Sequence, residues 1–369
     1  MRKQTLPATL LAISGIGGIG LSAGAAHAQS SVTLYGIADG GFTYTSNQGG
    51  KSNYQATAGS EQGSRWGLLG SEDLGGGNRA VFRLENGFNL MNGTASANGR
   101  IFGRQAWVGL SSDRYGTLTF GRQYNASQDS LEPLQLAADT VQYGTHPFDV
   151  DDINNTFRTD NSIKYVTPTF YGLQINTLYA LSGNAGNFAT NRSYSVGASY
   201  ANGPWHLGAA YVMLDHPATD TTGAIPSDNY FTFLKGISKQ RIYGAGGLYD
   251  IGNASVGLMY TNTRFELTPA SQYQTYQNAE ASLRYRISPA VHAAIGETYT
   301  NVSTNGKVDS WHYWQTTAGV QYFLSKSTDV YIDLLYQRAT NVVAQIEGAS
   351  GPSSSGTQFI AVTGIRHKF

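Results

Sequence analysis

The sequence predicts an all-β fold, namely a transmembrane antiparallel β-barrel of 16 strands. Three observations predict it. Apolar and polar residues alternate with period two in many segments. No apolar run of ~18 or more residues, the length that a membrane-spanning helix needs, follows the first 28 residues. Short turns also alternate with long polar connections along the chain. An aromatic-rich chain of this kind can cross a membrane only with alternating strands.

The first 28 residues read as a secretory signal peptide. Arg2 and Lys3 give a positive start, an apolar stretch covers residues 6–26, and Ala26-His27-Ala28 fits a small-x-small cleavage site. We therefore expect one barrel domain over residues 29–369, exported out of the cytoplasm.

The composition excludes several classes of protein. The chain has no cysteine, which excludes disulfide scaffolds, thiolate metal sites and thiol catalysis. Its 24 basic and 24 acidic residues balance, so no long-range attraction to nucleic acid is indicated. We expect no nucleic-acid partner, no metal and no cofactor.

The alternation is clearest in residues 192–200. Tyr194 and Val196 lie on one face of the predicted strand, and Ser193 and Ser195 on the other. Comparable patterns occupy residues 171–179, 279–287 and 330–336. Period two with one apolar face is typical of a strand that is buried on one side only.

The connections between these strands are of two kinds. The seven short ones are Asp73–Asn78, Ser112–Gly116, Pro168–Phe170, Asn202–Pro204, Asp250–Asn253, Ser288–Pro289 and Ser325–Thr328. The eight longer ones lie near residues 45–61, 92–99, 126–156, 183–191, 215–239, 265–276, 302–310 and 342–356. Short turns on one rim and long loops on the other are typical of outer-membrane barrels. Aromatic residues near strand ends fit interfacial girdles, although tyrosine also has a high strand propensity.

A barrel of this size predicts a water-filled channel. At about sixteen strands the interior is too wide for side chains to fill. The inward faces carry charges such as Glu85, Glu280 and Asp333, which a dry core would not tolerate. Passive passage of ions and small hydrophilic solutes follows, with no covalent step.

Several motifs resemble the Gram-negative general (trimeric) porins, in particular their β-proteobacterial branch. They are Ser31–Gly36, Ser64–Gly75, Phe102–Leu110, Gly116–Gln123 and Gly364–Phe369, and the similarity runs across residues 29–369. The resemblance implies a homotrimer in the outer membrane, in contact with outer-membrane lipid and lipopolysaccharide. Small residues such as Gly36, Ala38 and Gly70 could then pack at the shared axis. The terminal Phe369 is similar to the signal read by the barrel-assembly machinery, or is an ordinary girdle aromatic.

The resemblance also implies that the third long loop, Ala126–Thr156, folds inward and narrows the pore. In the family, its acidic side chains face arginines on the opposite wall. Arg65, Arg104 and Arg158 match the family's wall positions by local motif. The alternation of the two strand faces independently turns Arg65 inward, since Trp66 suits the outer face, and does the same for Arg158. This parity argument adds Arg83 and Lys164 and leaves Arg104 ambiguous. Arg122 shares a face with Leu118 and Phe120, so we do not expect it to line the pore, and a contact between subunits is an alternative.

The loop lacks the Pro-Glu-Phe-Gly motif known in the family. Glu132 and Asp139, then Asp129, are our candidates for the acids that face the arginines. Asp149, Asp151 and Asp152 could bind a divalent ion or contact the barrel wall, although their spacing is not that of a calcium loop. The wall arginines favour anions, whereas the zero net charge and the acidic loop oppose this, so the ion preference stays open.

Two alternatives belong to other classes of protein. A surface hydrolase would need a catalytic pattern, and neither His-Glu-x-x-His nor Gly-x-Ser-x-Gly occurs after the predicted signal peptide. The pair Asp215-His216 in a long loop is the nearest candidate. A ligand-specific channel or adhesin could use residues 215–239 as a binding surface. We expect a pore and not an enzyme.

Overall fold

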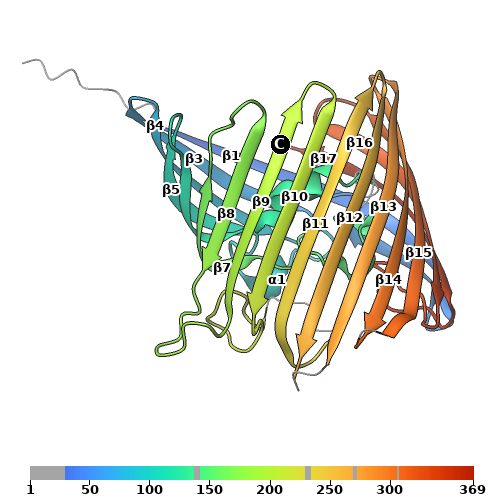
Figure 1. The fold of residues 1–369 in the computed structure, drawn as a ribbon. Helices are drawn as coiled ribbons and strands as arrows, with labels where there is room; N and C mark the ends of the chain where they lie inside the picture. The colour runs from blue at the N-terminus through green and yellow to red at the C-terminus, as the bar shows by residue number, and fades with distance from the viewer. Residues whose placement is uncertain (1–29, 137–141, 229–233, 269–271, 306) are drawn as a thin grey trace, which may run out of the picture.

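The computed structural model describes residues 30–136, 142–228, 234–268, 272–305 and 307–369. The predicted signal peptide lies outside these residues. The described chain forms one closed antiparallel sheet, which wraps into a 16-stranded barrel of tilted strands (Figure 1). Among the described residues, no helix combines the length and the apolar character needed to cross a membrane.

Apart from the second and third segments, which both pair with the first, each strand is hydrogen-bonded to the next one around the barrel. The strands are β1 (Ser31–Gln48), β2 (Lys51–Ala58), β3 (Arg65–Gly75), β4 (Asn78–Gly87), β5 (Gln105–Ser112), β6 (Gly116–Gln123), β7 (Thr159–Val166), β8 (Leu173–Ala180), β9 (Arg192–Asn202), β10 (Trp205–Asp215), β11 (Ile237–Ile251), β12 (Ala254–Leu267), β13 (Tyr273–Ser288), β14 (Val291–Thr304), β15 (Lys307–Phe323), β16 (Thr328–Thr340) and β17 (Thr357–Lys368). The last strand returns to the first, with Ile37 opposite Lys368 and Thr45 opposite Ile360. This closure removes the unpaired sheet edge that lipid would not tolerate.

Strands β2 and β3 together occupy one position in the barrel, which explains why 17 strand segments make a 16-stranded barrel. Both pair with β1: β2 pairs with its second half and β3 with its first half. Residues 59–64 separate them and leave the ladder.

The two faces of the sheet follow the predicted alternation. In β9, Tyr194 and Val196 are exposed, whereas Ser193 and Ser195 are buried. In β16, Ile332, Leu334 and Tyr336 form the corresponding exposed row. Exposed apolar rows and a buried polar face are the pattern of a barrel in lipid.

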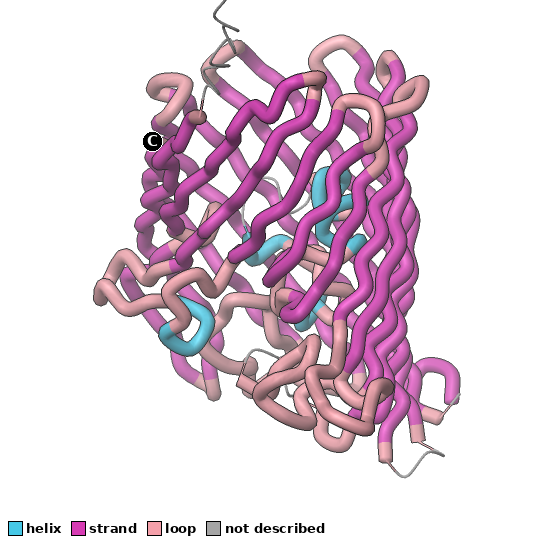
Figure 2. The backbone as a smooth tube through the Cα atoms, turned by 90° about the vertical axis from the view of Figure 1, so that its left-hand side faces the viewer, coloured by secondary structure: helices cyan, strands magenta, loops and turns pink. Residues whose placement is uncertain are grey.

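The connections segregate as predicted, with the longer loops at one rim (Figure 2). Three segments expected to be long loops are mostly strand. In residues 45–61, β1 and β2 continue to a tight turn at Gly49-Gly50, where both glycines have a positive φ. Strands β12 and β13 likewise extend to Leu267 and back from Tyr273, and β14 and β15 to Thr304 and back from Lys307. Polar composition suggested loops there, but both faces of a strand can be polar where it projects beyond the lipid.

The connection between β6 and β7, residues 124–158, is the predicted third loop. Its described residues form α2 (Ala126–Ser130) and three short 3₁₀ turns, Glu132–Leu134, Gln142–Gly144 and Pro147–Asp149. Asn125 caps α2 and forms a capping box with Gln128. Apolar residues of this loop pack on the buried faces of β10, β11 and β12, where Leu131, Leu134 and Leu136 meet Ala210, Leu248 and Met259. A further short helix, α1 (Ser96–Gly99), lies in the loop before β5.

Candidate pore constriction

A cavity of about 430 Å³ lies between the third loop and the barrel wall. Its walls carry opposite charges from segments that are distant in sequence. The lining residues are Glu61, Gln62, Arg65, Arg104, Glu132, Pro133, Gln135, Ile153, Asn154, Asn155 and Arg366. The cavity therefore brings together two of the predicted wall arginines, Arg65 and Arg104, with one of the predicted loop acids, Glu132.

Arg65 opens β3, and its neighbour Trp66 is exposed on the outer face, as the parity argument predicts. The Arg65 Nε donates a hydrogen bond to the Gly63 carbonyl, 2.8 Å away. No carboxylate of the described residues lies within ion-pair distance of Arg65. Its guanidinium therefore presents a net positive charge to the cavity.

Arg104 precedes β5, in the irregular end of a loop, which is why strand parity could not place it. It is buried, and its Nε contacts the Glu85 carboxylate at 2.8 Å. Its Nη2 donates to the Tyr124 hydroxyl at 2.9 Å. Since two fixed partners hold the planar group, its orientation toward the cavity is defined.

Arg158 and Arg83 do not line the cavity. The Arg158 guanidinium lies 5.7 Å from the centre of the Tyr124 ring and donates to the Asn155 carbonyl at 2.5 Å. It is therefore linked to Arg104 through their shared contact with Tyr124. The Arg83 guanidinium lies 5.6 Å from the centre of the Tyr35 ring, farther along the wall.

Lys164 and Asp129 form an ion pair with each other. Lys164 also donates to the Tyr124 carbonyl at 3.1 Å. We expected Asp129 to face the arginines, but the structure instead places its carboxylate against Lys164, because α2 turns it toward β7. Glu132, one turn later, is exposed. Asp139 lies outside the described residues.

Sequence reasoning missed Glu61, Gln62 and Arg366. The Arg366 Nη1 lies 3.1 Å from the Glu61 carboxylate, and its Nε lies 3.1 Å from that of Asp329. Parity could have found Arg366, since Ile365 next to it is exposed on the outer face. No signal pointed to Glu61, because its segment was interpreted as an outer loop.

The opposite side of the third loop is fixed to the wall by a buried polar network. Asp151 accepts hydrogen bonds from Thr261 of β12 and from Asn278 of β13, and its Oδ2 lies 2.6 Å from the His146 Nδ1. The His146 Nε2 lies 3.2 Å from the Glu280 carboxylate. The late acids of the loop were expected either to bind a divalent ion or to contact the barrel wall, and Asp151 contacts the wall.

The charge states in this network follow from burial and pairing. Burial opposes protonation of His146, but the neighbouring Asp151 and Glu280 outweigh it and raise the pKa of His146 to about 10. The pKa of Asp151 is lowered, since His146 outweighs the effect of burial. Burial raises the pKa of Asp149 to about 8, with a further contribution from Asp151. His146 is thus a cation at neutral pH.

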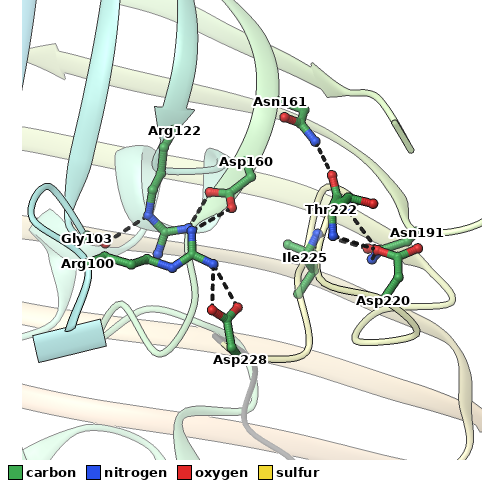
Figure 3. Close-up of polar contacts among 11 residues, drawn as sticks. Arg100, Gly103, Arg122, Asp160, Asn161, Asn191, Asp220, Thr222, Ile225 and Asp228 are labelled. Atoms are coloured by element: carbon green, nitrogen blue, oxygen red, sulfur yellow. Dashed lines mark hydrogen bonds and ion pairs between the residues drawn. The ribbon is translucent and has the colours of Figure 1, made fainter. Parts of the chain in front are cut away.

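Arg122 of β6 is buried, does not line the cavity, and connects the loop before β5 to strand β7. Its Nε donates to the Gly103 carbonyl at 2.9 Å, and its guanidinium pairs with Asp160. Arg100 pairs with the same Asp160 at 3.2 Å and with Asp228 at 2.7 Å (Figure 3). These contacts lie within one chain.

The small residues of the first strands are covered by rings of their own chain. A side chain at Gly36 would meet the ring of Phe369 at 2.3 Å, and one at Gly70 would meet the ring of Phe82 at 1.9 Å. Aromatic rings of the same chain therefore cover these glycines, and the packing of this face at a shared axis stays a prediction. Phe369 itself is exposed on one side, and its backbone exchanges two hydrogen bonds with Gly36.

The Asp215-His216 pair is held by structural contacts. The His216 Nδ1 lies 2.6 Å from the Asp215 carboxylate, which also lies 3.5 Å from the Arg192 Nε. The second partner of Asp215 is thus a cation of β9, which suits a rim ion pair.

Known proteins match both the sequence and the fold. Residues 9–341 match the Gram-negative porin family. An outer membrane porin protein of Bordetella pertussis is 35% identical over 291 residues, which cover 71% of this chain and 70% of that protein. Outer membrane porin protein 32 of Delftia acidovorans is 28% identical over the full length of both chains.

Solved structures agree on the fold. An anion-selective porin from Comamonas acidovorans superposes with a TM-score of 0.77 at 24% identity, covering 92% of this chain and all of that one. The trimer form of OmpT from Vibrio cholerae superposes with a TM-score of 0.67 at 16% identity, covering 92% and 99%. The chain belongs to the Gram-negative porin family, and it is an outer-membrane channel for passive diffusion rather than an enzyme.

Proposed function

We propose that this porin passes ions and small hydrophilic solutes through a lumen that the third loop narrows, with a preference for anions. The observation that carries the proposal is the cavity in which Arg65 and Arg104 share walls with Glu132. Opposed fixed charges set a transverse field across a narrow aqueous gap. Hydrated, dipolar solutes orient in such a field, whereas apolar solutes would have to displace ordered water.

The ion pairs around the cavity support the preference for anions. Glu61 is paired with Arg366, and Glu85 is paired with Arg104. Among the described residues, Arg65 and Arg158 have no carboxylate within ion-pair distance. Arginine stays charged at every relevant pH, so this excess of positive charge is permanent. The Comamonas acidovorans porin, which shares the fold, is anion-selective.

We further propose that residues 1–28 are a signal peptide that directs export of the chain. The mature protein then forms a homotrimer that is surrounded by outer-membrane lipid and lipopolysaccharide. The trimer form of OmpT supports the assembly by analogy. The exposed apolar rows of the strands would face lipid or a neighbouring subunit. Phe369, which follows β17 and has its ring over Gly36, suits recognition by the barrel-assembly machinery.

Single-channel recording in a planar bilayer tests this function. The purified protein, folded in detergent, is added under a salt gradient. We expect conductance steps in groups of three and a reversal potential of the sign for anion flow. A cation-selective reversal potential, or folded protein that gives no steps, would refute the proposal.

A further inference from the structure

The interruption of the second barrel strand is a feature that no loop pattern predicts. Ala58 at the end of β2 pairs with Gly40 of β1, and Arg65 at the start of β3 pairs with Ile37. Two residues of β1, Ala38 and Asp39, therefore face the six residues 59–64. Because the interruption holds four residues more than the ladder can use, it must leave the plane of the sheet.

Asp39 holds this interruption on the inner face of the barrel. The Asp39 side chain is fully buried, and its Oδ2 accepts the backbone N–H groups of Glu61 and Gln62 at 3.0 and 2.6 Å. Its Oδ1 accepts the Tyr331 hydroxyl at 2.7 Å. The backbone of Asp39 also bonds to Gly59 at 2.9 Å and exchanges two bonds with the Ser64 hydroxyl. A carboxylate with three donors is a strong local anchor.

The backbone geometry at Gly59 shows that this conformation depends on a glycine at that position. Its φ is +70°, and a side chain there would lie 2.8 Å from the Gly63 Cα. Both the backbone angle and the close approach require glycine. Gly59 and Gly63 together let the chain leave and re-enter the wall.

The interruption approaches the third loop and shares its cavity. The Ser60 hydroxyl lies 3.4 Å from the Tyr143 hydroxyl of the third loop. Glu61 and Gln62 line the cavity that Glu132 and Pro133 line from the loop side. The Arg366 Nη1 lies 3.1 Å from Glu61 and 3.3 Å from the Gln62 Oε1. The cavity is thus enclosed by two elements that leave the regular sheet.

We propose that residues 59–64 form a second constriction element, and that the Glu61–Arg366 pair determines ion specificity by cancelling one positive charge at the pore wall. This inference rests on the proposed diffusion function and names a determinant outside the arginines expected from sequence. Glu61 and Asp329 offset Arg366, and Glu85 offsets Arg104, so the net positive field at the cavity comes mainly from Arg65. Removal of either partner shifts that field, with opposite signs for the two partners.

Reversal potentials of Glu61→Gln and Arg366→Gln in a gradient of ~0.1 M salt, where charges act over about 10 Å, test the proposal. Glu61→Gln leaves Arg366 paired with Asp329, so folding is retained. We expect the anion-to-cation permeability ratio to rise about twofold in Glu61→Gln and to fall by a similar factor in Arg366→Gln, the effect of one charge several ångströms away in water. The double variant should return close to the unaltered protein.

Glu72→Gln is the matched control, because Glu72 is exposed on β3, away from the cavity. Shifts of opposite sign in the two single variants support a direct electrostatic role, whereas a structural disturbance would move both ratios in the same direction. Unchanged ratios in both, or shifts of the same sign, would overturn the inference. If the unaltered protein itself conducts no ions, the proposed function fails rather than this pair.

Discussion

Charged residues are paired and buried on the side of the third loop that packs on the barrel wall, and they are exposed or unpaired on the side that faces the cavity. On the wall side, Asp151, His146 and Glu280 are buried, and His146 contacts both carboxylates, so each charge has a partner of opposite sign. On the cavity side, Glu132 is exposed and Arg65 has no carboxylate in reach among the described residues. Buried charges must be paired or they cost several kcal/mol, of the order of 3–5. The difference shows two roles for charged residues in this loop. The buried ion pairs on the wall side hold the loop in place, and the charges on the cavity side stay unpaired and exposed to water.

The largest effect is expected when the wall side loses Asp151, its central hydrogen-bond acceptor. Asp151→Ala removes the group that accepts from Thr261 and Asn278 and leaves His146 buried beside Glu280 alone. We expect a loss of about 3–5 kcal/mol in the free energy of unfolding and a noisy, enlarged single-channel conductance, since the loop is released. Urea unfolding and bilayer recording measure the two effects.

Asp113→Asn is the matched control for Asp151→Ala. It removes an exposed ion pair with Arg79, which is worth about 0–1 kcal/mol, and should leave conductance unchanged. A quiet channel of normal stability in Asp151→Ala would contradict the anchoring role of the wall side.

The pH dependence of stability sharpens the same comparison. The pKa of His146 is raised to about 10, so the folded protein keeps a proton that the unfolded chain releases near pH 6.5. This contribution is complete below that value and is lost as pH rises toward 10, by up to about 1.4 kcal/mol per pH unit. Asp149, with a pKa of about 8, acts in the same direction only at lower pH.

The window between pH 8 and 10 therefore isolates His146. We expect the unfolding midpoint of the protein to fall across this window and the midpoint of His146→Gln to fall less. Parallel curves for the two proteins would show that His146 is neutral in the folded state.

Substitution on the cavity side should change selectivity and leave stability almost unaltered. Arg65→Ala removes an uncompensated cation from the cavity, so we expect a shift of a few-fold toward cations and a larger conductance. Arg158→Ala should act in the same direction but more weakly, because Arg158 does not line the cavity. Arg79→Ala, at an exposed site, is the control. Equal permeability ratios in the unaltered protein and the three variants would show that neither Arg65 nor Arg158 contributes to the constriction.

The sequence predicted the regular part of the molecule because its strands follow one physical rule. Alternation with period two gives both the strand and its lipid face, as Tyr194 and Val196 illustrate. The rule also placed Arg65, since Trp66 faces outward. It could not place Arg104, which lies in irregular chain and is oriented by Glu85 and Tyr124.

The charged groups of the site were harder to predict because their partners are distant in sequence. Asp129 pairs with Lys164 through the path of the loop, which no local pattern encodes. Glu61 depends on a mismatch in register between two strands, and that mismatch is visible only after the pairing with β1 is known. The charges of the candidate site that the strand pattern could not place, such as Glu61, Arg104 and Glu132, lie where the chain departs from regular strands.

Thiol labelling at Glu132 tests the central claim most directly, since the chain has no cysteine of its own. Glu132→Cys is reacted with a bulky thiol reagent during bilayer recording, with Tyr171→Cys, 99% exposed in a short turn, as the control. We predict an abrupt, reagent-dependent fall in conductance in Glu132→Cys and none in Tyr171→Cys. Full labelling of Glu132→Cys with unchanged conductance would contradict the assignment of this cavity as the pore constriction.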